Sequence, residues 1–323
     1  MVPAARRLLL ALLLACHAAH AQQPSVRTIG ILTPGGESYG ATIAGLRDGL
    51  RETGFEEGKH FVLHIRDVKG DLRAAEAAAR TFEDENVSLL CTLSTSTTLA
   101  AKRGTRRVPI AFYAGTDPVT VGLVESYSKP GGRFTGVHGQ ATDLTAKRLQ
   151  MLRDILPRMR RVVTFYNPEN EVARRSLDLG RRAARQLNIE VVERPVRSIE
   201  ELRAALRALH PGEVDAVLHV SDAMITSDAD YIVQMADKLK LATLFQDKEV
   251  VKRGALASYG LSYYAIGRQL SKTVERLLKG ARPADIPVQQ VDRVEFVVNL
   301  KTAKALGLVL PQSIRSRADE IIE

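Results

Sequence analysis

The sequence predicts an α/β protein of two doubly wound, parallel-sheet lobes joined by hinge crossovers. From Arg27 onward, short apolar runs rich in β-branched residues alternate with longer segments of helical period, a pattern typical of parallel sheets covered by helices. The chain has 323 residues, of which 45% are apolar, more than one compact core usually holds. The predicted strands also fall into two sets, separated by a loop-rich stretch with several prolines and glycines at residues 116–142.

The first set of predicted strands covers residues 28–32, 61–65, 87–90 and 110–113. The segment 38–53 between the first two has helical period, because its apolar residues Tyr39, Ile43, Leu46 and Leu50 share one face. Asp71 precedes a second such segment and is expected to cap that helix. Cys91 adjoins the third strand, so we expect its thiol to be buried.

The second set of predicted strands covers residues 162–166, 189–192, 214–220, 242–245 and 256–259, with a late apolar run at 294–298. Ser198 begins a capping box, which opens a helix whose leucines recur at helical spacing. A later helix is predicted from Ile266, Leu270, Val274 and Leu277, which recur on one face.

These sets define the expected domains. Residues 25–140 are expected to form the N-terminal lobe, to which roughly 262–285 return, and residues 141–260 the C-terminal lobe together with roughly 290–323. Crossings are expected within 116–142, near 259–263 and within 281–291. Gly132 and Gly136 are candidate pivots for a hinge in the first crossing.

Residues 1–21 have the pattern of a cleavable signal peptide. Arg6 and Arg7 precede a short apolar run, and Ala19 and Ala21 supply small residues before the expected cleavage point. The apolar run is far shorter than the ~20 residues that a membrane-spanning helix needs. We therefore expect export to the periplasm; in the alternative interpretation, residues 13–16 form a lipobox and Cys16 carries a lipid anchor.

The composition argues against several partners and cross-links. The formal charge is +9, but the basic residues are spread over helix faces, tryptophan is absent and aromatic residues make up 5%, so no nucleic-acid partner is expected. The chain has two cysteines, and one of them, Cys16, lies in the leader. An internal disulfide is therefore not expected, and stability must come from the core.

The motif search finds no cofactor, metal or catalytic signature. Glycine-rich phosphate loops are absent. Residues 36–40 (GESYG) have the G-x-S-x-G spacing, but we do not assign them as a nucleophile elbow. His219 lies near Asp222, but no nucleophile accompanies this pair. We accordingly predict no catalytic residue, no metal and no cofactor.

Polar residues recur where predicted strands end, which is where open α/β sheets bind ligands. The run Ser94–Thr98 places hydroxyl and N–H groups at a helix N-terminus, an arrangement that suits a carboxylate. Asp222 in the second half could hold an ammonium group, so an amino acid spanning both lobes is one hypothesis. The candidate ligand-binding residues are Thr33, Ser38, Ser94, Thr95, Ser96, Asp117, Tyr166, Asn167, Ser221, Asp222 and Phe245.

Three segments carry a resemblance to a known family. They are PIAFYAGTDPVTVGLVESYSKPGGRFTGV at residues 109–137, FYNPEN at 165–170 and NLKTAKALGLVLPQSIRSRADEIIE at 299–323. With these segments the chain resembles the bacterial ABC-transporter substrate-binding proteins of the tryptophan/tyrosine-uptake type, which have a type I periplasmic-binding fold. Phe134 and His138 depart from the polar or small residues more typical of the family at those positions.

The resemblance implies a monomeric solute-binding protein without catalytic activity. Its lobes would close on a small molecule, an aromatic amino acid or related carboxylate, and deliver it to an inner-membrane ABC permease. Two alternatives stay open at this point. One is an exported α/β hydrolase with an unrecognised site around Asp117, Asp222 or His219, and the other is a ligand-sensing module for a membrane receptor.

Overall fold

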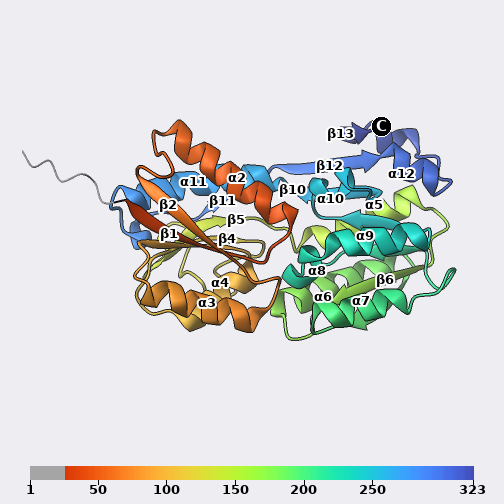
Figure 1. The fold of residues 1–323 in the computed structure, drawn as a ribbon. Coiled ribbons are helices and arrows are strands. Elements are labelled where there is room, and N and C mark those ends of the chain that lie inside the picture. The colour runs from red at the N-terminus through yellow and green to blue at the C-terminus, as the bar shows by residue number, and fades with distance from the viewer. Residues whose placement is uncertain (1–25) are drawn as a thin grey trace, which may run out of the picture.

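A computed structural model describes residues 26–323 and places two α/β lobes side by side (Figure 1). The predicted export leader at residues 1–21, with Cys16, lies outside the described residues. Within residues 26–323, each helix is too short or too polar to cross a membrane. The predicted architecture of two lobes built on mainly parallel sheets is confirmed.

The first lobe contains a six-stranded sheet whose neighbouring strands are all parallel. Across the sheet the order is β11 (Gln289–Gln290), β5 (Phe134–His138), β4 (Ile110–Ala114), β3 (Leu89–Leu93), β1 (Arg27–Thr33) and β2 (Phe61–Asp67). One face packs on α2 (Glu37–Glu52) and α11 (Tyr263–Leu278), the other on α3 (Leu72–Asp84) and α4 (Thr95–Gly104) (Figure 1). Since both faces are covered, β3, β4 and β5 are buried along their whole length, whereas the edge strands β2 and β11 are largely exposed.

The second lobe contains a seven-stranded sheet. Its order is β13 (Glu320–Ile322), β12 (Val294–Asn299), β10 (Ala257–Leu261), β9 (Ala242–Phe245), β8 (Ala216–Leu218), β6 (Arg161–Tyr166) and β7 (Glu190–Pro195). One face carries α5 (Leu144–Ile155), α6 (Glu171–Gln186), α12 (Leu300–Ala305) and α13 (Gln312–Arg315). The other carries α7 (Ile199–Arg207), α8 (Ala223–Ser227), α9 (Ala229–Lys238) and α10 (Lys248–Lys252).

Two neighbouring strands of the second sheet, β12 and β13, run opposite to the others and so differ from the predicted parallel arrangement. β12 pairs antiparallel with β10, so that Leu261 faces Val294 and Ala257 faces Val298. The chain leaves this lobe at the end of β10 for α11, and it returns at the start of β12. Because exit and re-entry lie at the same lobe boundary, β12 must run back along β10.

Within residues 26–323 the chain passes between the lobes three times, at residues 139–143, at 262 and at 291–293. These segments lie close together. A Cβ atom added to Gly139 would meet the Leu261 side chain and the Val291 carbonyl oxygen. The Ser262 N–H also donates to the Arg293 carbonyl oxygen at 3.2 Å. The three crossovers therefore form one compact connection between the lobes, outside both sheets.

The stretch 116–142, predicted to be loop-rich, contains a buried strand that the sequence analysis missed. β5 pairs with β4 along five positions, and all five of its residues are buried. The candidate pivot Gly136 lies inside β5, where an added Cβ would overlap the backbone of Phe112. The absence of a side chain at Gly136 therefore permits close packing of β5 on β4, and the crossover begins only after this strand.

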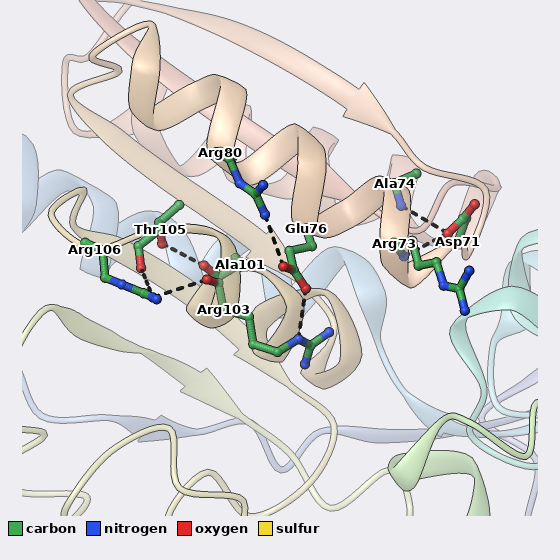
Figure 2. A network of polar contacts seen from close by, with 9 residues as sticks. All are labelled: Asp71, Arg73, Ala74, Glu76, Arg80, Ala101, Arg103, Thr105 and Arg106. Atoms are coloured by element: carbon green, nitrogen blue, oxygen red, sulfur yellow. Dashed lines mark hydrogen bonds and ion pairs between the residues drawn. The ribbon is translucent and has the colours of Figure 1, made fainter.

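The two predicted helix caps are present. The Asp71 carboxylate accepts from the N–H groups of Arg73 and Ala74 at 2.8 and 3.0 Å, and the Ser198 hydroxyl accepts from Glu201 N–H at 3.2 Å. Figure 2 shows Asp71 beside a surface network in which Glu76 of α3 accepts from Arg80 and from Arg103 of α4. Exposed ion pairs of this kind contribute little, about 0–1 kcal/mol each.

Glycines bring the early helix α2 into close contact with the late helix α11. An added Cβ at Gly267 would overlap the Thr42 carbonyl oxygen, and one at Gly45 would overlap the carbonyl oxygen of Tyr264. Both positions have ordinary helical backbone, so their requirement for glycine is steric. This pairing attaches the returning chain segment firmly to the first lobe.

We expect Gly267→Ala to lower the free energy of unfolding by about 1–3 kcal/mol, because the added methyl group overpacks the α2–α11 contact. Gly40→Ala is the matched control, since nothing lies within 4 Å of a Cβ at that position of α2. That control should be stabilising by about 0.5–1 kcal/mol. Urea unfolding measures both changes, and equal effects of the two substitutions would contradict the steric interpretation.

Candidate functional site

The carboxyl ends of the parallel strands in both sheets face the lobe boundary. Ser94 directly follows β3, Gly115 follows β4 and Gln246 follows β9, while Ser221 lies just beyond β8. A cavity between the lobes is lined by Tyr39, Ser94, Thr95, Ser96, Tyr113, Gly115, Ala141, Thr142, Val172, Ser221, Asp222, Ala223, Gln246 and Tyr263. Both lobes therefore contribute to its wall, at the place where open α/β sheets bind ligands.

The cavity has a volume of about 30 Å³. This is close to one water molecule's share of liquid water, ~30 Å³, whereas pockets for small organic ligands measure ~300–1,000 Å³. An amino-acid-sized ligand therefore requires the lobes to move apart, which the crossovers allow.

The first lobe presents the N-terminus of α4 to the cavity. The Ser94 hydroxyl caps this helix by accepting from the Thr97 N–H at 3.0 Å. The N–H groups of Thr95 and Ser96 bond to no other atom of the described chain, and both side chains are buried. Free N–H groups and the positive end of the helix dipole favour an anionic group here.

The second lobe presents the carboxylate of Asp222, which is 2% exposed. One oxygen accepts from the Asn167 N–H at 2.8 Å, and the other accepts from the Met224 N–H at 2.9 Å. Burial raises the pKa of Asp222, although these N–H donors oppose the shift. A cationic group beside this carboxylate would remove the cost of burying its charge.

Tyrosines form the apolar part of the wall. The rings of Tyr39 and Tyr263 meet edge to face at 5.2 Å, and Tyr113 lies 6.4 Å from Tyr263. Burial raises the pKa of all three hydroxyls, so they stay protonated. The Gln246 amide donates to the Tyr263 hydroxyl at 2.8 Å and accepts from Ser221 at 3.1 Å. The cavity thus combines aromatic surface with hydrogen-bonding groups.

Hydrogen bonds join the two lobes around the cavity. Ser96 of α4 donates to the Asn170 side chain at 3.0 Å, and Ser38 of α2 donates to the Asp247 carboxylate. Burial raises the pKa of Asp247 to about 6, against the opposing effect of the Ser38 hydrogen bond. The lobe contact therefore includes a carboxyl group that titrates in a mildly acidic range.

The structure brings Ser94, Thr95, Ser96, Ser221 and Asp222 of the predicted site residues together in the cavity wall. Ser38 and Asn167 lie just behind that wall. Ser38 bonds Asp247 across the boundary, and the Asn167 N–H donates to Asp222.

The remaining predicted residues do not reach the cavity. Asp117 accepts from Thr120 and Tyr127 within its own loop, at 2.7 and 2.8 Å. Phe245 packs in the core of the second lobe beside His219, with 5.2 Å between ring centroids. The Thr33 hydroxyl accepts from the Gly35 N–H at 3.1 Å, and Tyr166 is a half-buried residue at the end of β6.

The sequence analysis missed several wall residues as site candidates. Gln246 is the first residue after β9, so the strand-end rule would have found it in place of Phe245. Tyr113 lies inside β4, one residue before the strand ends, and its long side chain contributes to the cavity wall. Tyr263 belongs to α11, whose return to the first lobe places it opposite Gln246. Its position depends on the crossover, which no local pattern shows.

The acid–base pair considered for a hydrolase, His219 with Asp222, is not formed. The His219 ring bonds Thr226 at 3.2 Å rather than Asp222, and burial lowers its pKa to about 3, so the ring is neutral. Within residues 26–323, no three His, Cys, Asp or Glu side chains cluster in a way that could hold a metal ion.

Two wider grooves also follow the lobe boundary. One is lined by charged side chains such as Arg66 and Arg203, the other by Lys248 and Glu249. Their charges are solvated or paired, as in the 2.7 Å contact between Arg203 and Asp228. The N–H groups of Thr95 and Ser96 and the buried carboxylate of Asp222 lie instead at the small cavity at the strand ends.

Comparison with known proteins agrees with this architecture. The model of a family described as ABC transporter substrate binding protein matches residues 28–322. The tyrosine-binding protein of Clostridioides difficile (strain R20291) is 27% identical over 259 residues, which are 80% of this chain and 74% of that protein.

Two solved structures share the fold. A conserved domain protein from Vibrio cholerae O1 biovar eltor str. N16961 is 28% identical, with a TM-score of 0.83 over 92% of this chain and 99% of that chain. An ABC domain from Streptococcus pneumonia, solved in complex with L-Trp, is 23% identical, with a TM-score of 0.82 over 92% of this chain and 100% of that chain. With a family match over almost all of the described residues, this chain belongs to the ABC transporter substrate-binding proteins.

Proposed function

We propose that this protein binds the zwitterion of an aromatic amino acid between its lobes and delivers it to a membrane permease. The observation that carries the proposal is the cavity, which places a helix N-terminus of one lobe opposite a buried carboxylate of the other. Two relatives support the ligand class, because one is named for tyrosine binding and another was solved with L-Trp.

In this proposal the ligand carboxylate lies at the N-terminus of α4, near Ser94, Thr95 and Ser96. The ammonium group lies beside Asp222, and the ring packs against Tyr39 and the other tyrosines of the wall. Each end of the ligand thus contacts a different lobe, so the ligand favours a state in which the lobes close on it, with a wider cavity than the present one, over the open state.

We propose that the moving bodies are residues 25–140 with roughly 262–285, and residues 141–260 with roughly 290–323. The packing of α11 on α2 supports the first body, and the pairing of β12 with β10 supports the second. The hinge then consists of the crossovers, which absorb the change in backbone dihedral angles.

Family membership implies a small-molecule ligand and an ABC permease as partners, and members are typically extracellular or periplasmic. We propose export to the periplasm by the leader at residues 1–21, a soluble monomer and no nucleic-acid partner. A lipid anchor on Cys16 is the alternative form of the same exported protein.

We further propose that the protein is not an enzyme. In support, the His219 ring bonds Thr226 rather than Asp222 and is held neutral by burial. Presentation of the ligand to a membrane receptor, in place of a permease, would use the same closed state.

L-tryptophan or L-tyrosine should raise the melting temperature of the mature protein by about 5 °C or more at ligand concentrations near 100 times Kd. L-leucine should act more weakly, because it lacks a ring to pack against the tyrosines. Differential scanning fluorimetry measures the shift. Failure of every amino acid to shift the melting temperature, with turnover of model esters, would instead support the hydrolase.

Asp222→Asn should weaken L-tryptophan binding by at least about tenfold, which corresponds to ~1.4 kcal/mol, because the ammonium group loses its counter-charge. Asp71→Asn is the matched control, since Asp71 also caps a helix but lies away from the cavity. Isothermal titration calorimetry compares the three proteins. Wild-type affinity in Asp222→Asn would remove this carboxylate from the proposed site.

Protonation of Asp247 should stabilise the closed, folded protein as the pH falls. Burial raises its pKa to about 6, so between about pH 4 and pH 6 the folded state binds a proton that the unfolded state releases. From pH 7 to pH 5 this contribution to the free energy of unfolding should grow by ~1 kcal/mol. Urea unfolding should show it as a difference in pH dependence between wild type and Asp247→Asn; identical pH dependence is the contradicting result.

A further inference from the structure

Arg148 of α5 is a buried cation without a buried anion beside it. Its side chain is 0% exposed. Two of its nitrogens donate to neutral oxygens, at 3.1 Å to the Ala141 carbonyl, 2.9 Å to the Thr145 hydroxyl and 3.3 Å to the Tyr259 carbonyl. Among residues 26–323 no carboxylate lies within ion-pair distance of it, and its Nε has no hydrogen-bond partner.

Burying a guanidinium removes its charge from water, which costs free energy. A counter-ion normally offsets this desolvation cost, and Arg148 has none. Burial lowers the pKa of Arg148 to about 10, so the side chain still carries its charge at neutral pH. The buried carboxylates near the cavity are otherwise engaged. Asp222 accepts backbone N–H groups, and Asp247 accepts from Ser38.

The charge of Arg148 lies directly behind the cavity wall. Ala141, which accepts from it, lines the cavity, and the charge also acts on the hydroxyls of Tyr113 and Tyr263. Thr145, the second acceptor, bonds Ser176 at 2.7 Å, and Ser176 in turn accepts from the backbone of Ser221. Arg148 is thus joined by hydrogen bonds to the wall on both sides of the cavity.

We propose that Arg148 is a specificity-determining residue whose missing counter-charge is the ligand's own carboxylate. The inference rests on the proposed function and deepens it, because it states how the site selects amino acids over the corresponding amines and amides. Arg148 does not need to touch the ligand. Its field acts through the Ala141 and Tyr113 wall, where a low-dielectric surrounding leaves charge interactions strong. The positive potential of Arg148 thus adds to that of the α4 N-terminus, and both favour the ligand carboxylate.

The test compares L-tryptophan with L-tryptophanamide, which keeps the ring and the amine but lacks the carboxylate charge. Isothermal titration calorimetry at one pH gives the affinity ratio of the two ligands for wild type and for Arg148→Met. The intrinsic difference between the ligands cancels in this comparison. We expect the preference for the carboxylate ligand to fall about tenfold or more in Arg148→Met, with little change in amide affinity.

Lys147→Met is the matched control, because Lys147 is the preceding residue of α5 and is exposed. It removes the same formal charge from the same helix and should leave the ratio unchanged. Equal losses for both ligands in Arg148→Met would show a purely structural role and overturn the inference. A wild-type protein that binds neither ligand would instead overturn the proposed function.

Arg148→Lys decides the question if Arg148→Met does not fold. Lysine keeps the charge but not the planar fork. Retention of most of the wild-type preference for L-tryptophan supports a role of the charge. Loss of that preference, in a protein that still binds the amide, overturns it.

Discussion

The direction of the parallel strands is the constraint on which the rest of this structure depends. In both sheets the parallel strands run toward the lobe boundary, so their carboxyl ends meet there. Helix α4 begins at that edge in one lobe and α8 in the other. Helix N-termini and their capping side chains are therefore concentrated between the lobes, and the binding site follows from the winding of the chain.

Desolvation makes this boundary chemically distinctive. Asp222, Asp247 and Arg148 are all buried near one small cavity, and burial shifts the pKa of each toward its neutral form. Ion pairs elsewhere, such as those around Glu76, are exposed and contribute little. The buried charged groups around the cavity are thus a small minority in a chain of formal charge +9.

Hydrogen bonds connect the hinge with the cavity. Arg148 bonds the first crossover through Ala141 and the middle of β10 through Tyr259. Ser221 and Gln246 continue the polar contacts to Tyr263 at the start of α11. The same hydrogen bonds therefore fix both the crossovers and the cavity wall, and in the proposed function they would couple lobe motion to ligand contact.

The sequence by itself determined the class of fold, most strands and helices, the caps at Asp71 and Ser198, and five residues of the cavity wall. These features depend on local periodicity and on the residues directly after strands. A short stretch of sequence is therefore enough to predict them. β5 was not predicted from the sequence, because its burial comes from neighbouring strands and its glycine is a residue typical of loops. The exclusion of Asp117 and Phe245, and the inclusion of Tyr113 and Tyr263, were decided only by tertiary structure. The crossovers bring together segments more than a hundred residues apart in the sequence. The burial of Arg148 without a neighbouring carboxylate results from this tertiary packing, and no local pattern shows it.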